Sequence, residues 1–336
     1  MKYLSLYLLI VLIISCAACK PTNRTDVAND VEGMTNAVGP DFSADSAYFY
    51  CEKQCSFGAR TMNSDAHEKC KDWIVERFKQ YGCDVEEQKA DLKGYDGTLL
   101  KSTNIIARFR PEAKQRVMLC AHWDSRPWAD NDPDEKNWHT PVIAANDGAS
   151  GVAVMIEIAR LVQNDTTINV GIDFVCFDAE DWGAPQWTGL QMEDSWALGA
   201  QHWAKNYKPD ADKDIMFGIL LDMVGGENAQ FYKEQFSMKH APRIVDKVWS
   251  AAQSAGYSGY FVQDTGGAIT DDHVPINTIA GIPTIDIIPH YPYDERSSFG
   301  PTWHTIDDTM QHIDRQTLKA VGQTVIQTLY LIEKES

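Results

Sequence analysis

Short, almost wholly apolar segments recur along this chain and constrain its fold more than any other feature. The most apolar of them lie at residues 168–177, 215–222 and 283–288. Near-continuous hydrophobicity over so few residues is typical of central strands that helices cover on both faces of a sheet. Further strand patterns precede them, at residues 84–90, 98–110 and 116–121.

Helical patterns occur before, between and after these strand segments. They lie at residues 43–58, 64–81, 148–162 and 314–333. The last of them has Asp314 as its expected N-cap and an apolar stripe with helical spacing. Strands that alternate with helices predict an α/β fold, here a three-layer sandwich with a central mixed, mostly parallel β-sheet flanked by helices.

The first 19 residues have the pattern of a signal peptide. Lys2 precedes an apolar stretch over residues 3–14, which is too short to span a bilayer and suits a signal-peptide core. The small residues before Cys16 and Cys19 resemble a bacterial lipoprotein cleavage site, and either cysteine could be the lipidated one. The alternative is an ordinary secreted protein cut near Ala18. In both cases we expect an exported protein, and the lipoprotein pattern predicts a periplasmic, membrane-anchored one.

The rest of the chain divides into a tether and one domain. Residues 20–40 are polar and lack periodicity, as in a flexible tether, and no repeat or linker interrupts residues 41–336. The formal net charge of −18 argues against nucleic acid and anionic membrane surfaces as partners. We therefore expect membrane contact only through the N-terminal lipid anchor.

Export makes disulfides chemically possible. Cys51 and Cys55 are four residues apart on one expected helix, where the geometry is poor for a bridge between them. Cys70 and Cys83 straddle the next expected helix. Any bridge would therefore join a cysteine of the first pair to one of the second.

Acidic residues and histidines gather where the expected strands end. They are His122, Asp124, Glu180, Asp181, Asp222, Asp286 and His290, from four different strands. In open α/β sheets, ligands bind beyond the carboxyl ends of the strands, so these side chains are candidates for one site. Carboxylates together with histidine suit zinc, which leaves its fourth position to the substrate. Because neighbours in extended chain point to opposite sides, one of Glu180 and Asp181 can bind metal while the other stays free as an acid or base.

Each of these residues also has a purely structural explanation. Asp147 could be the N-cap of the helix at 148–162, and Glu180 with Asp181 could form a solvated turn. His304 could be a half-buried histidine beside a capping box of Thr305 and Asp308. Asp222 could be a turn acid. A shared functional site is the simpler explanation, because otherwise all of these separate structural explanations would have to be true at once.

Six motifs resemble a known superfamily. They are "HWDS", "NDGASG", "FDAED", "LLDMVG", "DDHVPI" and "WHTIDD", in the order found in the zinc aminopeptidases and animal-type glutaminyl cyclases, and they span about residues 45–333. Within the superfamily the chain resembles the bacterial glutaminyl cyclases related to the animal enzymes. The features that favour the cyclases are "DDHVPI", Trp303 directly before His304, and Trp187 shortly after the acidic pair.

This resemblance implies a role for each site residue. The ligands of one zinc ion would be Asp147, Asp181 and His304. Glu180 would be the general acid/base, and Asp222 with Asp271 would form an acidic relay beside it, with Asp272 as the alternative to Asp271. Trp187 and Trp303 would line the substrate pocket.

The sequence departs from the animal cyclases in three places. Asp181 stands where they have glutamate, and Asp286 stands where they have histidine. The segment "HYPYDERSSFGPTWH", residues 290–304, is longer than its animal counterpart. This longer segment leaves the substrate preference open.

The implied activity is that of a glutaminyl-peptide cyclotransferase, an acyltransferase that converts N-terminal glutamine to pyroglutamate and releases ammonia. Its substrates would be exported peptides or proteins with N-terminal glutamine. The first alternative is a di-zinc aminopeptidase, whose second metal would need His122 and Asp222 with Asp147 as a bridge, and all three residues are present. The second is a binding protein on a degenerate peptidase scaffold.

Overall fold

The computed structural model describes residues 37–209 and 214–332. The predicted signal peptide and nearly all of the predicted tether lie outside these residues, and the division of the chain into tether and domain stays a prediction. Within the described ranges, no helix combines the length and the apolar character needed to cross a membrane.

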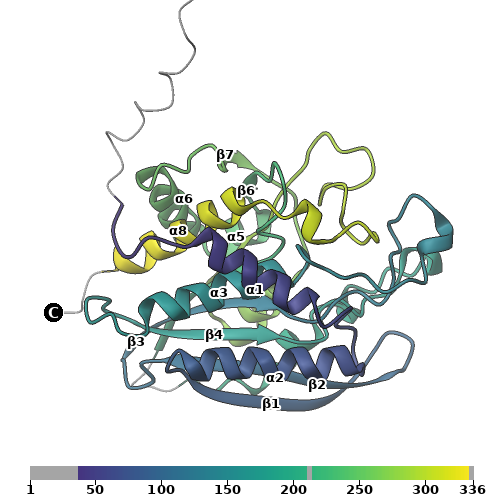
Figure 1. Cartoon of the computed structure of the whole chain (residues 1–336), viewed down its shortest axis with the longest axis horizontal. Coiled ribbons are helices and arrows are strands. Elements are labelled where there is room, and N and C mark those ends of the chain that lie inside the picture. Colours follow the sequence, from purple (N-terminus) through teal and green to yellow (C-terminus); the bar gives the residue numbers. More distant parts are fainter. Residues whose placement is uncertain (1–36, 210–213, 333–336) are drawn as a thin grey trace, which may run out of the picture. The chain divides into compact units, whose positions relative to one another are not determined.

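A six-stranded mixed sheet forms the centre of the fold (Figure 1). In sheet order its strands are β1 (Asp84–Lys93), β2 (Leu99–Phe109), β4 (Gly171–Phe177), β3 (Gln115–His122), β5 (Asp214–Leu221) and β8 (Thr284–Ile287). β1 pairs antiparallel with β2, and β2 antiparallel with β4. The remaining pairs, β4 with β3, β3 with β5 and β5 with β8, are parallel. The prediction of a mixed, mostly parallel sheet is confirmed.

Helices cover both faces of this sheet. The α-helices of the described residues are α1 (Ala44–Cys55), α2 (Asp65–Gln80), α3 (Ala149–Val162), α4 (Leu198–Asn206), α5 (Gln235–His240), α6 (Pro242–Ser254), α7 (His273–Pro275) and α8 (Arg315–Tyr330). Residues of α1, α2, α3, α6 and α8 share one buried cluster with Leu119 and Ile219. Trp203 of α4 belongs to a second cluster, with Met118 and Cys120. Because neighbouring residues of β3 point to opposite faces, the two clusters are the two cores of a three-layer α/β sandwich.

The helix α3 is the central helix of the first layer. Its sequence predicts one apolar face, but nearly all of its residues are buried, because α1 and α8 lie beside it (Figure 1). Gly151 lets α3 approach the sheet closely, since a Cβ at this position would lie 2.0 Å from the carbonyl oxygen of Leu221. This approach brings the start of α3 next to the end of β5.

Several elements were not expected from the sequence. They include α4, α6 and a small two-stranded sheet of β6 (Phe231–Lys233) and β7 (Phe261–Thr265). The structure contains none of the disulfides that export would allow, since all six cysteines after the predicted signal peptide are free thiols. Cys51 and Cys70 are completely buried in the core, and the Cys51 thiol donates to the carbonyl oxygen of Ala145.

Candidate active site

Most of the acidic and histidine side chains predicted for the site converge at the carboxyl ends of the central strands. Two do not, because Asp286 is fully buried within β8 and His290 lines a different cavity. His122 ends β3, Asp222 follows β5, and Glu180 and Asp181 come three and four residues after the end of β4. Asp147 precedes α3, and His304 lies in the loop before α8. Asp147, Asp181 and His304 offer ligand atoms that all lie within 4.8 Å of one another, and so do His122, Asp147 and Asp222.

The burial of these residues argues against their structural explanations. Glu180 is only 8% exposed and Asp181 only 1%, so they do not form a solvated turn. Asp147 does not cap α3, because Gly148 occupies the N-cap position and no side chain caps that helix. Buried carboxylates need partners or a bound cation. These acids therefore need an explanation in the chemistry of the site.

The group of Asp147, Asp181 and His304 has the donor set of a zinc site. His304 Nε2 lies 3.3 Å from Asp181 Oδ1 and 3.6 Å from Asp147 Oδ2. Asp181 Oδ2 is buried without a hydrogen-bond partner. Burial alone would lower the pKa of His304, but Asp181 and Asp130 raise it to about 9, which shows how strongly these carboxylates favour a positive charge here. Two carboxylates and one imidazole fit zinc with an open fourth position.

A carboxylate behind His304 completes this arrangement. Asp130 Oδ1 lies 3.4 Å from His304 Nδ1, and Arg126 holds Asp130 with two hydrogen bonds of 3.0 and 2.8 Å. A metal-binding histidine usually donates its second ring N–H to such a carboxylate, which fixes the tautomer and the ring orientation. The Arg126–Asp130 pair was not identified in the sequence, because no motif there marks it.

Asp308 and Asp124 hold the backbone of the candidate ligands in place. The Asp308 carboxylate accepts hydrogen bonds from the backbone N–H groups of Asn146 and Asp147, at 2.7 and 3.0 Å. Burial raises the pKa of Asp308 to about 7, against these two hydrogen bonds. The Asp124 carboxylate likewise accepts hydrogen bonds from the backbone N–H groups of Glu180 and Asp181, which follow β4. The sequence pattern marks both acids as polar residues beside the site but does not predict this function for either.

The backbone near the site adopts conformations that non-glycine residues rarely occupy. Ala179, Met223 and His304 have φ values of 52°, 49° and 53°. Each is a candidate site residue or the neighbour of one. Such strain persists where the surrounding structure fixes the residue, and it concentrates at functional sites.

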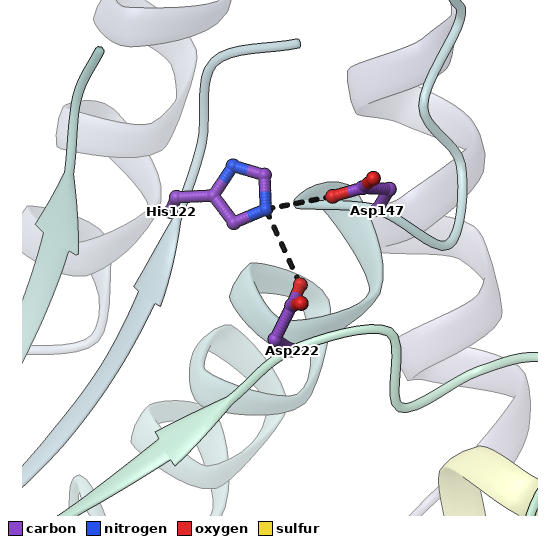
Figure 2. A group of neighbouring side chains, drawn as sticks. All are labelled: His122, Asp147 and Asp222. Carbon is purple, nitrogen blue, oxygen red and sulfur yellow. Dashed lines mark hydrogen bonds and ion pairs between the residues drawn. The ribbon is translucent and has the colours of Figure 1, made fainter. Parts of the chain in front are cut away.

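The group of His122, Asp147 and Asp222 shares the Asp147 carboxylate with the group of Asp147, Asp181 and His304. Figure 2 shows His122 pointing at both Asp147 and Asp222, with Nε2 at 3.0 Å from Asp147 Oδ1 and 3.3 Å from Asp222 Oδ1. Asp147 thus faces His122 with one oxygen and His304 with the other. The three residues needed for a second metal are therefore close together, as the two-metal alternative requires.

Glu180 belongs to neither group of candidate ligands. Burial, together with the nearby charges of Asp271 and Asp181 and opposed by His122, raises the pKa of Glu180 well above its usual range. Burial also raises the pKa of Asp222 to about 7, against the hydrogen bond from His122. Carboxyls tuned in this way can hold or release a proton near neutral pH.

A cavity of about 510 Å³ gives access to these groups, and we call it the catalytic cavity. Its polar lining includes Asp147, Glu180, Asp222, Asp271 and His304. Asp271, not Asp272, lines it; Asp272 is fully buried and both of its carboxyl oxygens lack a hydrogen-bond partner.

Two tryptophans form part of the wall of the catalytic cavity. Trp303 lines it and stacks on the His304 ring, with the centroids 3.8 Å apart. The second is Trp196, whereas Trp187 is not among the lining residues. Trp187 instead stacks on Trp138 and packs against His139. Tryptophans at 182, 187 and 196 all follow the acidic pair, and their spacing does not indicate which one the loop turns inward.

Comparisons with known proteins agree with this geometry. The model of peptidase family M28 matches residues 104–329. The crystal structure of Bacteroides thetaiotaomicron glutaminyl cyclase bound to N-acetylhistamine is 52% identical, with a TM-score of 0.84, and the match covers 88% of this chain and 100% of that one.

Two curated relatives are more distant in sequence. Aminopeptidase YwaD of Bacillus subtilis is 27% identical over 75% of this chain and 49% of its own length. Glutaminyl-peptide cyclotransferase of Bos taurus is 26% identical over 64% of this chain and 62% of its own length. The chain thus spans about half of the first relative and less than two thirds of the second.

Proposed function

The chain belongs to peptidase family M28, and we propose that within this family it is a glutaminyl-peptide cyclotransferase. The observation that carries the proposal is the 52% identity to a solved glutaminyl cyclase, over the whole of that chain. The free carboxyl of Glu180 beside a complete set of zinc ligands supports it. The implied reaction joins the α-amine of an N-terminal glutamine to its own side-chain amide carbon, breaks the bond to the amide nitrogen and releases ammonia.

The family and the donor set point to zinc, and we propose one zinc ion per chain, held by Asp147, Asp181 and His304. Zinc bound there would supply Lewis-acid stabilisation of the negative charge that develops on the amide oxygen. The Asp130 carboxylate would keep the His304 ring oriented toward the ion.

Glu180 would move the proton of the reaction. It would accept a proton from the attacking amine and return it to the departing nitrogen, so that one carboxylate serves as base and then as acid. Its raised pKa suits the second step, because a carboxyl with a higher pKa holds the proton until the leaving group needs it. Asp222 and Asp271, which line the same cavity, would form the acidic relay beside it.

The apolar wall would hold the substrate in the reactive conformation. Trp303 and Trp196 leave limited room, so a glutamine side chain would fold back onto its own amine with few water molecules present. We include Trp196 for this role in place of Trp187, which packs outside the cavity lining.

We further propose that the substrates are exported peptides or proteins with N-terminal glutamine and that the enzyme is a periplasmic lipoprotein. The N-terminal pattern of Lys2, an apolar core and small residues before Cys16 and Cys19 supports export. Labelling with a fatty-acid analogue, followed by mass spectrometry of the N-terminal peptide, would identify the lipidated cysteine. A mature chain without lipid would contradict the anchor.

The test of the proposed function compares two activities of one preparation. We expect ammonia release from a dipeptide that begins with glutamine and no hydrolysis of leucine anilide. The second candidate, a two-metal aminopeptidase, is favoured by the proximity of His122, Asp147 and Asp222. Hydrolysis of the anilide without ammonia release from the dipeptide would overturn the cyclase proposal in favour of that candidate.

A further inference from the structure

The longer segment at residues 290–304 forms one side of a second cavity. The segment is closed by a hydrogen bond from the Tyr291 backbone N–H to Ser298, and it ends at the candidate ligand His304. Between the segment and residues 226–232 lies a cavity of about 450 Å³, which we call the aromatic cavity. Because this segment forms a wall of the cavity and continues to the candidate ligand His304, the cavity is a candidate determinant of specificity.

The lining of the aromatic cavity combines aromatic rings with carboxylates. The rings are those of Tyr232, Tyr291, Tyr293 and Phe299, and the acids are Glu227 and Asp294. Among the described residues, no lysine or arginine lines it. Ring faces and carboxylates together attract cations, which is the chemistry that recognises lysine and arginine side chains.

Both acids are available to a ligand. The backbone N–H groups of Arg296 and Ser297 donate to Asp294 and, with the charge of Arg296, lower its pKa, so this carboxylate is ionised at neutral pH. The Arg296 guanidinium itself donates to the carbonyl oxygen of Pro301 and does not line the cavity.

The two histidines that line the cavity, His290 and His312, do not cancel the charges of Glu227 and Asp294. Glu227 lies 3.8 Å from His312, and its side chain is 56% exposed. Burial lowers the pKa of His290, the second lining histidine, which therefore stays neutral. The cavity is thus negative overall.

The aromatic cavity adjoins the catalytic cavity. Phe299 lines both of them and packs against Trp303, with the ring centroids 4.7 Å apart. A peptide whose first residue lies in the catalytic cavity therefore has the other cavity beyond Phe299, and an extended chain advances about 3.3 Å per residue. A side chain from one of the next few residues can reach it.

We propose that the aromatic cavity binds a lysine or arginine side chain that follows the N-terminal glutamine of the substrate. This inference rests on the proposed function, which it deepens by defining the substrate class as basic peptides. The contacts would come from Glu227 and Asp294 as charge partners and from Tyr293, which is 94% exposed, as a ring that closes over the cation.

The experiment measures ammonia release from tetrapeptide amides that begin with glutamine and carry lysine, methionine or glutamate at position two, three or four. We expect kcat/KM to be about 3- to 30-fold higher for lysine than for methionine at one of these positions, mostly through a lower KM. The double variant E227Q/D294N and the variant Y293A should lose this preference.

The matched control is Glu295→Gln. Glu295 is an exposed acid of the same segment, and it does not line the cavity. If E295Q lost the preference as much as E227Q/D294N, general attraction by an acidic surface would explain it and the inference would be wrong. An equal preference in the wild type and E227Q/D294N would also overturn it.

A binding measurement separates this inference from the proposed function. The variant E180Q, titrated calorimetrically with the same peptides, reports binding without turnover, and we expect tighter binding of the lysine peptide that E227Q/D294N removes. If no peptide releases ammonia, the proposed function fails, and this titration alone decides whether the cavity binds cationic side chains. Equal binding of all peptides would refute the cavity's role.

Discussion

The carboxylate of Asp124 accepts a hydrogen bond of 3.1 Å from the backbone N–H of Glu180. Its second oxygen accepts one of the same length from the next residue, so both members of the acidic pair are held by one buried side chain. Asp124 itself is 1% exposed. Asp124 thus positions the backbone of both Glu180, the proposed acid/base, and Asp181, the proposed zinc ligand.

Replacing Asp124 should disturb both catalysis and stability. D124A leaves two buried N–H groups without acceptors, which we expect to cost about 2 to 6 kcal/mol of the free energy of unfolding, at about 1 to 3 kcal/mol for each group. D124N keeps one acceptor oxygen, so its free energy of unfolding and its kcat should lie between those of D124A and the wild type. Urea unfolding and kcat measure the two effects. Wild-type values for D124A would show that Asp124 does not position the pair.

Glu180→Gln removes the group proposed to transfer the proton while it preserves size and polarity. General acid–base catalysis contributes about 10²- to 10⁴-fold, so ammonia release should fall by that factor. Zinc content should not change, because Glu180 is not among the proposed ligands. The measurements are steady-state kinetics and elemental analysis of the same preparation. Unchanged turnover would exclude Glu180 from the mechanism, and loss of zinc would make it a ligand.

The sequence predicted the framework and most of the site because these depend on local patterns. Apolar runs located the central strands within a few residues, and the acids that end them lie where parallel strands place them. The motif resemblance named Asp147, Asp181 and His304, which the structure brings within 4.8 Å.

Other features depend on contacts between distant segments, which no local pattern records. Trp196 lines the catalytic cavity and Trp187 does not, because the loop between them turns through a short 3-10 helix at Glu193–Ser195 that the sequence did not suggest. The role of Asp308 likewise appears only when the chain brings it next to Asn146 and Asp147. The burial of α3 on nearly all sides follows from the packing of α1 and α8.

Zinc affinity of the metal-free protein should depend on pH through His304. The pKa of this imidazole is raised to about 9, so at neutral pH the ring is protonated and must lose that proton to bind a cation. We expect the affinity to rise by about tenfold per pH unit between pH 6 and 8, as one proton is released. Competition with a chelator of known affinity measures this slope. An affinity independent of pH would show that His304 binds no metal.

Glu234 should contribute stability that acid removes. Burial alone would raise its pKa, but the hydrogen bond and charge of His273, with the N–H groups of Phe236 and Ser237, lower it to about 2. In the unfolded chain the pKa is about 4.3. Because the folded value is the lower one, this stability is present above pH 4.3 and is lost as the pH falls toward 2. It amounts to at most about 3 kcal/mol.

The variant E234Q should therefore be less stable than the wild type at pH 7 and nearly as stable at pH 2, where most of the stabilisation by the charged carboxylate is lost. Denaturant unfolding at both pH values measures the difference. The same loss of stability at both would show that packing, not charge, accounts for the effect of Glu234. The control is the variant E86Q. Glu86 forms a partly exposed ion pair with Arg108, so its replacement should change the free energy of unfolding little at either pH.

Metal stoichiometry decides between the one-zinc and two-metal proposals, and two histidines provide the test. His304 contacts Asp147 and Asp181, whereas His122 contacts Asp147 and Asp222. If one zinc ion is held by the first group, the wild type should contain one per chain, H304A should lose it, and H122A should retain it. If two metals are bound, the wild type should contain two and each variant should lose at least one.

Mass spectrometry under native conditions counts the ions. The control variant H122N tests whether the cavity that alanine leaves at position 122 alters the metal content. Two ions in the wild type, with one lost in both H122A and H122N, would contradict the one-zinc site.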